Sequence, residues 1–357
     1  MDIFFYFLIS LVAILLSCVI FSNSVEWLGA KLNLSHGVTG SILAAVGTAL
    51  PETVVPLVAI FWGIQKDDLI KVLTGQADAT LNSVNQISMG AIIGAPFMLG
   101  TVAFFLIGFS SLLYYKSGRR KSKVIKVDKT VLERDLTFFL ISFSLGFLGI
   151  FLINHTYHVI LALVLVVLYV IYFYKTITEE ANDEFEGEEL EGNIDQFLLS
   201  KINPNLKPTM LLIILQLVSS LLLLIYSAHH FVNVIKDVSS MFALPAFIIS
   251  LLLTPIATEL PEKFNSWMWI RQKKDTLAVG NISGALVFQS TFPVSIGLLF
   301  TTWHIESRLS YLTFIFSLLS AAIVLIALKM NKLNFKVFLV GGVFYLIYLA
   351  LVLFQVF

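Results

Sequence analysis

The sequence predicts an all-α polytopic membrane protein whose ten transmembrane helices form two inverted-topology five-helix repeats. Three observations predict this fold: the composition, the length of the apolar stretches, and two repeated motifs. Hydrophobic residues make up 58% of the 357-residue chain and charged residues only 13%, whereas charged residues make up about 25% of a typical soluble domain. A soluble protein with this composition would expose large apolar patches and aggregate. The composition therefore excludes a soluble enzyme.

Residue counts and missing motifs argue against three further classes. The 23 basic and 23 acidic residues balance, so the chain lacks the positive charge of a nucleic-acid-binding protein. Cys18 is the only cysteine, so no disulfide forms within the chain. The apolar stretches contain neither His-Glu-x-x-His nor Gly-x-Ser-x-Gly, which argues against an intramembrane enzyme. We expect a protein that is not an enzyme and holds no cofactor.

Ten apolar stretches are each long enough to cross a bilayer, since a transmembrane helix needs about 20 mostly apolar residues. They are continuously apolar rather than alternating, which favours helices over a β-barrel. The ten stretches span residues 3–22, 37–62, 85–113, 136–153, 157–174, 209–229, 244–269, 277–301, 310–328 and 336–356.

The distribution of lysine and arginine predicts the orientation. With the N-terminus outside, the inner loops hold 18 of the 23 basic residues, the outer loops hold four, and Lys263 lies within a span. Because positive loops stay on the cytoplasmic side, we expect a multi-pass protein of the cell membrane with both termini outside. The basic run 116–134 is then an anchor beside anionic lipid rather than a nucleic-acid site.

Two motifs occur twice, in the same order. Residues 46–52, Val-Gly-Thr-Ala-Leu-Pro-Glu, match residues 256–262, Ile-Ala-Thr-Glu-Leu-Pro-Glu, and a Gly-x-x-x-Gly-Ala motif at Gly90 recurs at Gly280. Each half has five spans, and an odd number inverts the second half, as in secondary transporters.

The repeat divides the chain into three units. We expect a first five-helix repeat over 1–175, an acidic cytoplasmic linker over 176–208 and a second, inverted repeat over 209–357. The two motif offsets differ by 20 residues, so the first half carries an outer insertion at roughly 64–84.

Four charged residues lie deep in the spans: Glu52, Glu259, Glu262 and Lys263. A charged side chain at the bilayer centre costs about 2.5–3.5 kcal/mol on insertion scales. Glu52 and Glu262 are equivalent in the repeat, so they are expected to converge on one site near mid-membrane.

Prolines and hydroxyls accompany these carboxylates. Pro51 and Pro261 precede the two glutamates, and Pro255 adds a second break, so we expect broken helices with freed backbone carbonyls. Carboxylate, carbonyl and hydroxyl oxygens are hard ligands that suit Ca²⁺ and Na⁺. The candidate metal ligands are Glu52, Glu262, Glu259, Thr48, Thr258, Asn281 and the carbonyls of Gly47 and Ala257.

These residues resemble the cation/calcium exchanger superfamily, specifically its sodium/calcium exchanger branch. The family pattern is a Gly-Thr-Ser-Leu-Pro-Glu helix followed by a Gly-Asn/Asp-x-x-Gly-Ser-Asn helix, in two inverted copies. Residues 47–52 match the first helix at five of six positions, and residues 257–262 are a looser copy. The resemblance implies ten helices, both termini outside and a Ca²⁺ site between the two glutamates.

The departures from the family pattern leave the coupling ion open. The family serine before Leu-Pro-Glu is Ala49 in one half and Glu259 in the other, and the Asn or Asp of the next helix is Ala91 and Asn281. We expect a secondary antiporter that moves Ca²⁺ in exchange for Na⁺, with an H⁺-coupled exchanger of the same fold as the alternative. A channel is less favoured, because inverted repeats favour alternating access. The expected partners are Ca²⁺, Na⁺ or H⁺ and the lipid bilayer, with no nucleic acid; the oligomeric state is not predicted.

Two expectations concern side chains beside the glutamates. Glu259 and Glu262 are neighbours on one helix face. Asn281 occupies a position where the family can have an acid, so Glu259 is expected to supply that carboxylate instead. Lys263 has two interpretations: a tethered cation paired with Glu259, or, as we favour, a side chain that points toward the inner interface. The Gly-x-x-x-Gly pairs predict close helix contacts.

Overall fold

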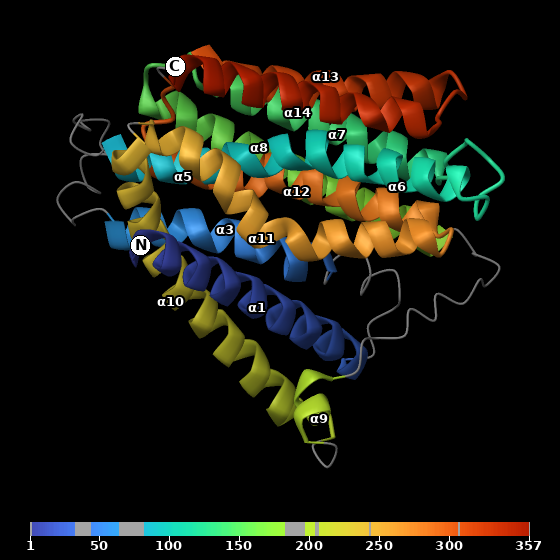
Figure 1. The fold of residues 1–357 in the computed structure, drawn as a ribbon, viewed down its shortest axis with the longest axis horizontal. Coiled ribbons are helices and arrows are strands. Elements are labelled where there is room, and N and C mark those ends of the chain that lie inside the picture. The colour runs from blue at the N-terminus through green and yellow to red at the C-terminus, as the bar shows by residue number, and fades with distance from the viewer. Residues whose placement is uncertain are drawn as a thin grey trace.

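The computed structural model describes residues 2–32, 44–63, 82–182, 197–203, 207–242, 244–305 and 308–356. Within these residues the chain is helical apart from its turns and one isolated β-bridge between Val124 and Asn334. Most of the helices run along the long direction of the molecule, while α1 and α10 cross it obliquely (Figure 1).

The described residues of the first half form six helices, and one π-helical turn joins two of them, α5 and α6. They are α1 (Asp2–Lys31), α3 (Ala44–Gly63), α5 (Asn82–Met98), the π-helical turn η3 (Leu99–Ala103), α6 (Phe104–Lys116), α7 (Lys129–Gly149) and α8 (His155–Asn182). Pro96 lies inside α5, just before η3. A proline removes one backbone donor, and a π-helical turn is a common adjustment of the helix ladder. The two helices therefore continue as one long element.

The residues described in the second half form five long helices after one short one. They are α9 (Leu198–Ile202), α10 (Met210–Phe242), α11 (Ala246–Arg271), α12 (Asp275–Phe300), α13 (Arg308–Lys329) and α14 (Phe335–Val356). Among the described residues, seven helical stretches are long and apolar enough to cross a membrane, and α3, α7 and α11 coincide with the other three predicted stretches. The insertion over 64–81 and the acidic residues 183–196 lie outside the described residues.

Both termini lie at the same end of the bundle (Figure 1), which we call the terminal end. The turns at 117–128, 272–274 and 330–334 lie at the opposite end, which we call the basic end. Most of their lysines and arginines are exposed, for example Arg119, Lys121, Lys273 and Lys332. Basic side chains that the sequence assigns to three separate inner loops thus share one end.

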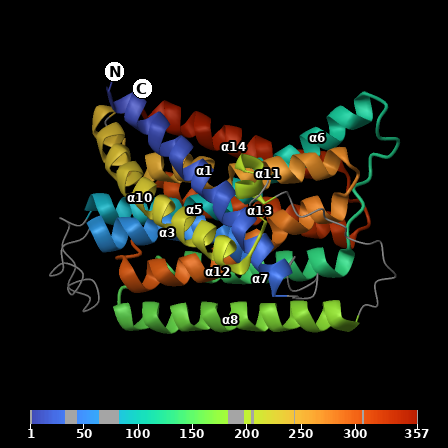
Figure 2. The same ribbon diagram turned by 90° about the horizontal axis from the view of Figure 1, so that it is seen from below.

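The two halves interlock rather than pack as separate units. α1 packs on α10, and α5 packs on α11. α12 packs on α7 and α8, and its counterpart in the first half, α5 through α6, packs on α13 and α14. The same contacts are obtained when each helix is replaced by its counterpart in the other half. Figure 2 shows α8 at the edge of the bundle, where Leu163, Val167 and Val170 are exposed, as expected of a lipid-facing helix.

The predicted helix breaks are wrong. α3 runs as an unbroken α-helix through Pro51, and α11 does so through Pro255 and Pro261. A proline removes a single amide donor, so the flanking hydrogen bonds can hold the helix together and the result is a bend. Figure 1 shows α11 changing direction along its length.

Candidate ion-binding site

The two Leu-Pro-Glu helices, α3 and α11, pack against each other. Glu52 on α3 is only 3% exposed. Ala257 on α11 belongs to the same buried apolar cluster as Val54 and Val55, which follow Glu52 on α3. The structure therefore brings the two motif helices into contact and includes residues of both in one buried apolar cluster. The residues Gly47 and Thr48 lie in α3, and Glu262 in α11, but their side chains lie outside the described part of the chain.

A stripe of hydroxyl side chains runs along α11 and contacts α5 at its first member, Ser250. Ser250, Thr254 and Thr258 recur every four residues and are all buried. The Ser250 hydroxyl donates to the carbonyl of Ile87 on α5 at 2.7 Å and lies 3.1 Å from the Thr254 hydroxyl. The Thr258 hydroxyl donates to the carbonyl of Thr254 at 3.2 Å. The predicted ligand Thr258 is thus the innermost member of a buried polar line.

A polar cavity of about 130 Å³ lies at the terminal end of this hydroxyl stripe. Asn85 and Gln86 from the start of α5 line it, together with His304, Phe247 and Ile248. Asn85 is 4% exposed, and its side-chain oxygen has no hydrogen-bond partner among the described residues. The cavity therefore lies at the N-terminal end of α11, close to the first hydroxyl of the stripe, Ser250.

Glu259 forms a buried ion pair with Lys263 on the next turn of α11. The Lys263 ammonium lies 2.7 Å from the Glu259 carboxylate, and it donates to the carbonyl of Pro255 at 3.4 Å. The two side chains are 0% and 5% exposed. The expectation that Lys263 points toward the inner interface is therefore wrong. Helical side chains lean toward the helix N-terminus, and this direction carries the ammonium back to Glu259.

The helix that packs on α11 beside this ion pair is α12. The side chain of Gln289 on α12 interacts with the Glu259 carboxylate. Further along, the Asn281 amide donates to the Ser266 hydroxyl at 3.3 Å, and Ser266 donates to the carbonyl of Ala278 at 3.2 Å. The structure thus places Asn281 of α12 opposite Ser266, which lies seven residues beyond Glu259 on α11.

The two Gly-x-x-x-Gly pairs differ in packing. A Cβ on Gly94 would lie 2.5 Å from the carbonyl oxygen of Leu251, and one on Gly90 would collide with the carbonyl of Phe247. A Cβ on Gly280 would meet no atom of the described residues within 4 Å. The close contact predicted from the motif is confirmed for α5 against α11 and is wrong for Gly280. The motif repeats, but its packing depends on the neighbouring helix.

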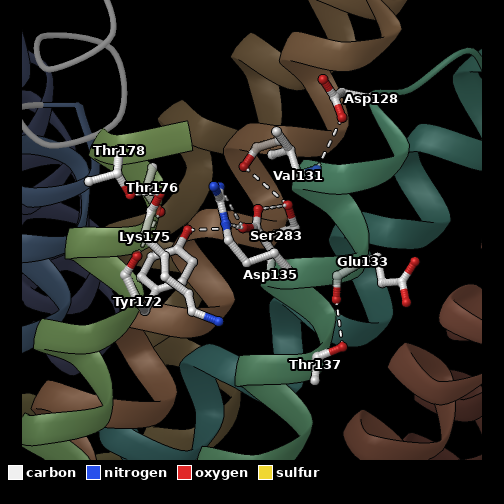
Figure 3. Close-up of polar contacts among 12 residues, drawn as sticks. Asp128, Val131, Glu133, Asp135, Thr137, Tyr172, Lys175, Thr176, Thr178 and Ser283 are labelled. Carbon is white, nitrogen blue, oxygen red and sulfur yellow. Dashed lines mark hydrogen bonds and ion pairs between the residues drawn. The ribbon is translucent and has the colours of Figure 1, made fainter. Parts of the chain in front are cut away.

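A second buried acid lies outside the predicted set (Figure 3). Asp135 on α7 is 1% exposed; it accepts hydrogen bonds from Ser283 of α12 at 2.6 Å and from Tyr172 of α8 at 3.1 Å. Arg134 pairs with the same carboxylate at 3.2 Å. Sequence reasoning missed Asp135 because it directly precedes the apolar stretch 136–153 and was assigned to a loop. The helix begins earlier, with Asp128 capping it through the Val131 amide.

The basic run at 116–134 also contains a buried residue. Arg120 pairs with Asp275 at the start of α12 through two nitrogens, one of them 2.7 Å from the carboxylate. The Lys126 amide donates to the same carboxylate at 2.9 Å. Arg120 therefore fastens the loop to α12, while most neighbouring basic side chains are exposed. In the described residues, no three of the His, Cys, Asp and Glu side chains are grouped closely enough to hold a metal ion.

Comparison with known proteins identifies a family. The model of the sodium/calcium exchanger protein family matches residues 3–178 and 212–357. No curated protein matches the sequence.

Several solved structures share the fold. The H⁺/Ca²⁺ exchanger CAX matches with a TM-score of 0.71 at 17% identity, over 98% of this chain and 82% of its own. YfkE matches with a TM-score of 0.63 at 12% identity, over 97% and 90%. The sodium-calcium exchanger NCX_Mj matches with a TM-score of 0.55 at 20% identity, over 97% of each chain.

Proposed function

Since the chain belongs to the sodium/calcium exchanger protein family, we propose that it is a secondary antiporter that moves Ca²⁺ in exchange for Na⁺ by alternating access. The protein is a multi-pass membrane cation/calcium exchanger and not an enzyme. The observation that carries the finer proposal is the buried Glu52, held on a Leu-Pro-Glu helix that packs against its repeat counterpart. An ionisable residue inside a transmembrane bundle is rare and commonly marks an ion pathway.

Ca²⁺ is proposed to bind between Glu52 and Glu262, near mid-membrane. The hydroxyls of Thr48 and Thr258 and the carbonyls of Gly47 and Ala257 would complete an oxygen-rich site, as Ca²⁺ requires. The buried hydroxyl of Thr258 and the packing of Ala257 beside α3 support this assignment. Asn281, at the contact of α11 with α12, would supply an amide oxygen from the basic side.

Alternating access is proposed to follow from ten spans in two inverted repeats, 1–175 and 209–357, joined by the linker 176–208. The matching helix pairs of the two halves support this arrangement, since α12 packs on α7 and α8 as α5 through α6 packs on α13 and α14. The terminal end would face the outside, so the cavity lined by Asn85 and His304 would be the outer entrance.

An H⁺-coupled exchanger of the same fold is the second candidate. Its supporting observation is Glu259, which stands where the family has a serine that helps form the Na⁺ sites. The fold match to the H⁺/Ca²⁺ exchanger CAX is compatible with either ion.

Ca²⁺ uptake into proteoliposomes tests both candidates. Purified protein is reconstituted, and a Na⁺ gradient, a pH gradient or neither is imposed at fixed membrane potential. Na⁺/Ca²⁺ exchange predicts uptake driven by the outward Na⁺ gradient alone. Uptake driven only by the pH gradient would identify H⁺ rather than Na⁺ as the coupling ion. Uptake without any counter-ion gradient would contradict antiport.

A further inference from the structure

The ion pair of Glu259 and Lys263 lies at the middle of a helix and has no obvious structural need. Glu259 is the fourteenth of the 26 residues of α11, and the pair is buried from solvent. Burying two charges is costly, and apolar residues of similar volume are often at least as stabilising as a buried pair. Stability alone therefore does not account for two charged residues at this depth.

The surroundings of the Lys263 ammonium resemble those of a bound monovalent cation. A carboxylate oxygen of Glu259 lies 2.7 Å away and the backbone carbonyl of Pro255 lies 3.4 Å away. Both are hard oxygen ligands of the kind that bind alkali ions. The ammonium carries the charge of such an ion, and the lysine stem fixes it to α11.

The pair also lies beside the hydroxyl stripe rather than across it. Gln289 of α12 interacts with Glu259, whereas Ser250 at the start of the stripe contacts α5. The pair and the first hydroxyl of the stripe therefore meet different neighbouring helices.

Lys263 changes the net charge of the residues proposed to bind cations. Glu52, Glu259 and Glu262 together carry −3, and Lys263 brings the sum to −2, the charge that one Ca²⁺ neutralises. Without the lysine, the third carboxylate would require an additional monovalent cation.

We propose that the Lys263 ammonium is a tethered cation that occupies one monovalent-cation position, so that the exchanger couples one fewer free cation to each Ca²⁺. This inference rests on the proposed Ca²⁺ antiport and names a determinant of its stoichiometry. Lys263 acts through Glu259, as a positioning residue.

The experiment measures the number of charges moved per Ca²⁺. Wild type, Lys263→Gln and the double variant Glu259→Gln/Lys263→Gln are reconstituted in proteoliposomes. Membrane potential is set with K⁺ and valinomycin, and the potential at which net Ca²⁺ flux vanishes is recorded. Arg271→Gln, an exposed residue at the end of α11, is the matched control for loss of a positive charge.

Lys263→Gln is expected to exchange one more monovalent cation per Ca²⁺ than wild type, with a correspondingly steeper dependence on its concentration. The double variant removes both charges and is expected to return to the wild-type ratio. An unchanged ratio in Lys263→Gln, or a raised ratio in the double variant, would overturn the inference.

Glu259→Gln provides a second test that does not require Lys263→Gln to fold. It leaves a positive charge on α11 without its counter-charge, so the apparent Ca²⁺ affinity of the proposed site is expected to fall at least tenfold, and adding Lys263→Gln is expected to restore it. Equal affinity in the single and double variants would contradict the tethered cation. Absence of Ca²⁺ flux in wild type would instead remove the proposed function, and the inference with it.

Discussion

The buried charges near the two Leu-Pro-Glu motifs have different surroundings. Glu52 is buried on α3, among helices from both halves. Glu259 is also buried, but its charge is balanced by Lys263 on its own helix. A carboxylate with a built-in counter-charge attracts a free cation less strongly than the same carboxylate alone. We therefore propose Glu52 and its repeat counterpart, rather than Glu259, as the acidic Ca²⁺ ligands.

The glutamine variants of Glu52 and Glu262 test that assignment. Each substitution keeps the shape of the side chain and removes the charge that binds a hard cation, so Ca²⁺ exchange is expected to be abolished. Initial rates of Ca²⁺ uptake in proteoliposomes are the measurement, with size-exclusion profiles to check folding.

Glu133→Gln is the control for these variants. Its carboxylate is 49% exposed and pairs with Lys329 at the surface, where an ion pair contributes about 0–1 kcal/mol. The uptake rate is expected to stay at the wild-type level. Normal Ca²⁺ flux in the Glu52 or Glu262 variant would show that the site lies elsewhere.

At the level of helices, identical motifs have different packing. Gly94 lets α5 approach the backbone of α11 closely, and Gly280 on α12 has no such neighbour among the described residues. The carbonyl that Gly94 approaches belongs to Leu251, four residues before Pro255, where the proline supplies no amide donor. The bend in α11 and the glycines of α5 are thus parts of one contact.

Alanine at the two positions should therefore have unequal effects on stability. Gly94→Ala places a methyl group 2.5 Å from a backbone oxygen, and overpacking of this kind costs about 1–3 kcal/mol. Gly280→Ala meets no atom of the described residues within 4 Å and is expected to be neutral or to stabilise the helix by up to about 1 kcal/mol. Thermal unfolding in detergent compares them. Equal midpoints for the two variants would contradict the asymmetric packing.

For the whole molecule, the two ends of the bundle carry different features. The buried pair of Arg120 and Asp275 ties the loop after α6 to the start of α12 at the basic end. The cavity beside α5 and α11 lies at the terminal end. The proposed site lies between these two ends, as alternating access requires.

Cysteine labelling tests which end faces outside. Cys18 is 2% exposed, so a Cys18→Ala background carrying Lys121→Cys or His304→Cys presents one exposed thiol at each end. A membrane-impermeant maleimide is expected to label His304→Cys in intact cells and Lys121→Cys only after permeabilisation. The reverse pattern would place both termini inside.

The sequence alone predicted the membrane class, the positions of the helices and the family, because these depend on local apolar length and on short motifs. It also identified Glu52 and Thr258, whose burial the structure confirms. Local patterns did not reveal that α3 and α11 remain continuous through their prolines, because the consequence of one missing donor depends on the neighbouring turns and helices.

Tertiary structure decided which side chains meet. Asp135 contacts Ser283, and Arg120 contacts Asp275, across 148 and 155 residues of sequence. Glu259 and Lys263 are only four residues apart, yet two features of the folded bundle decide that they pair. The lysine side chain points back toward Glu259, and both side chains are buried between the helices. Apolar length and motif order are properties of the chain. The partner of a charge is a property of the packed bundle, because burial determines which charges must be neutralised within the protein.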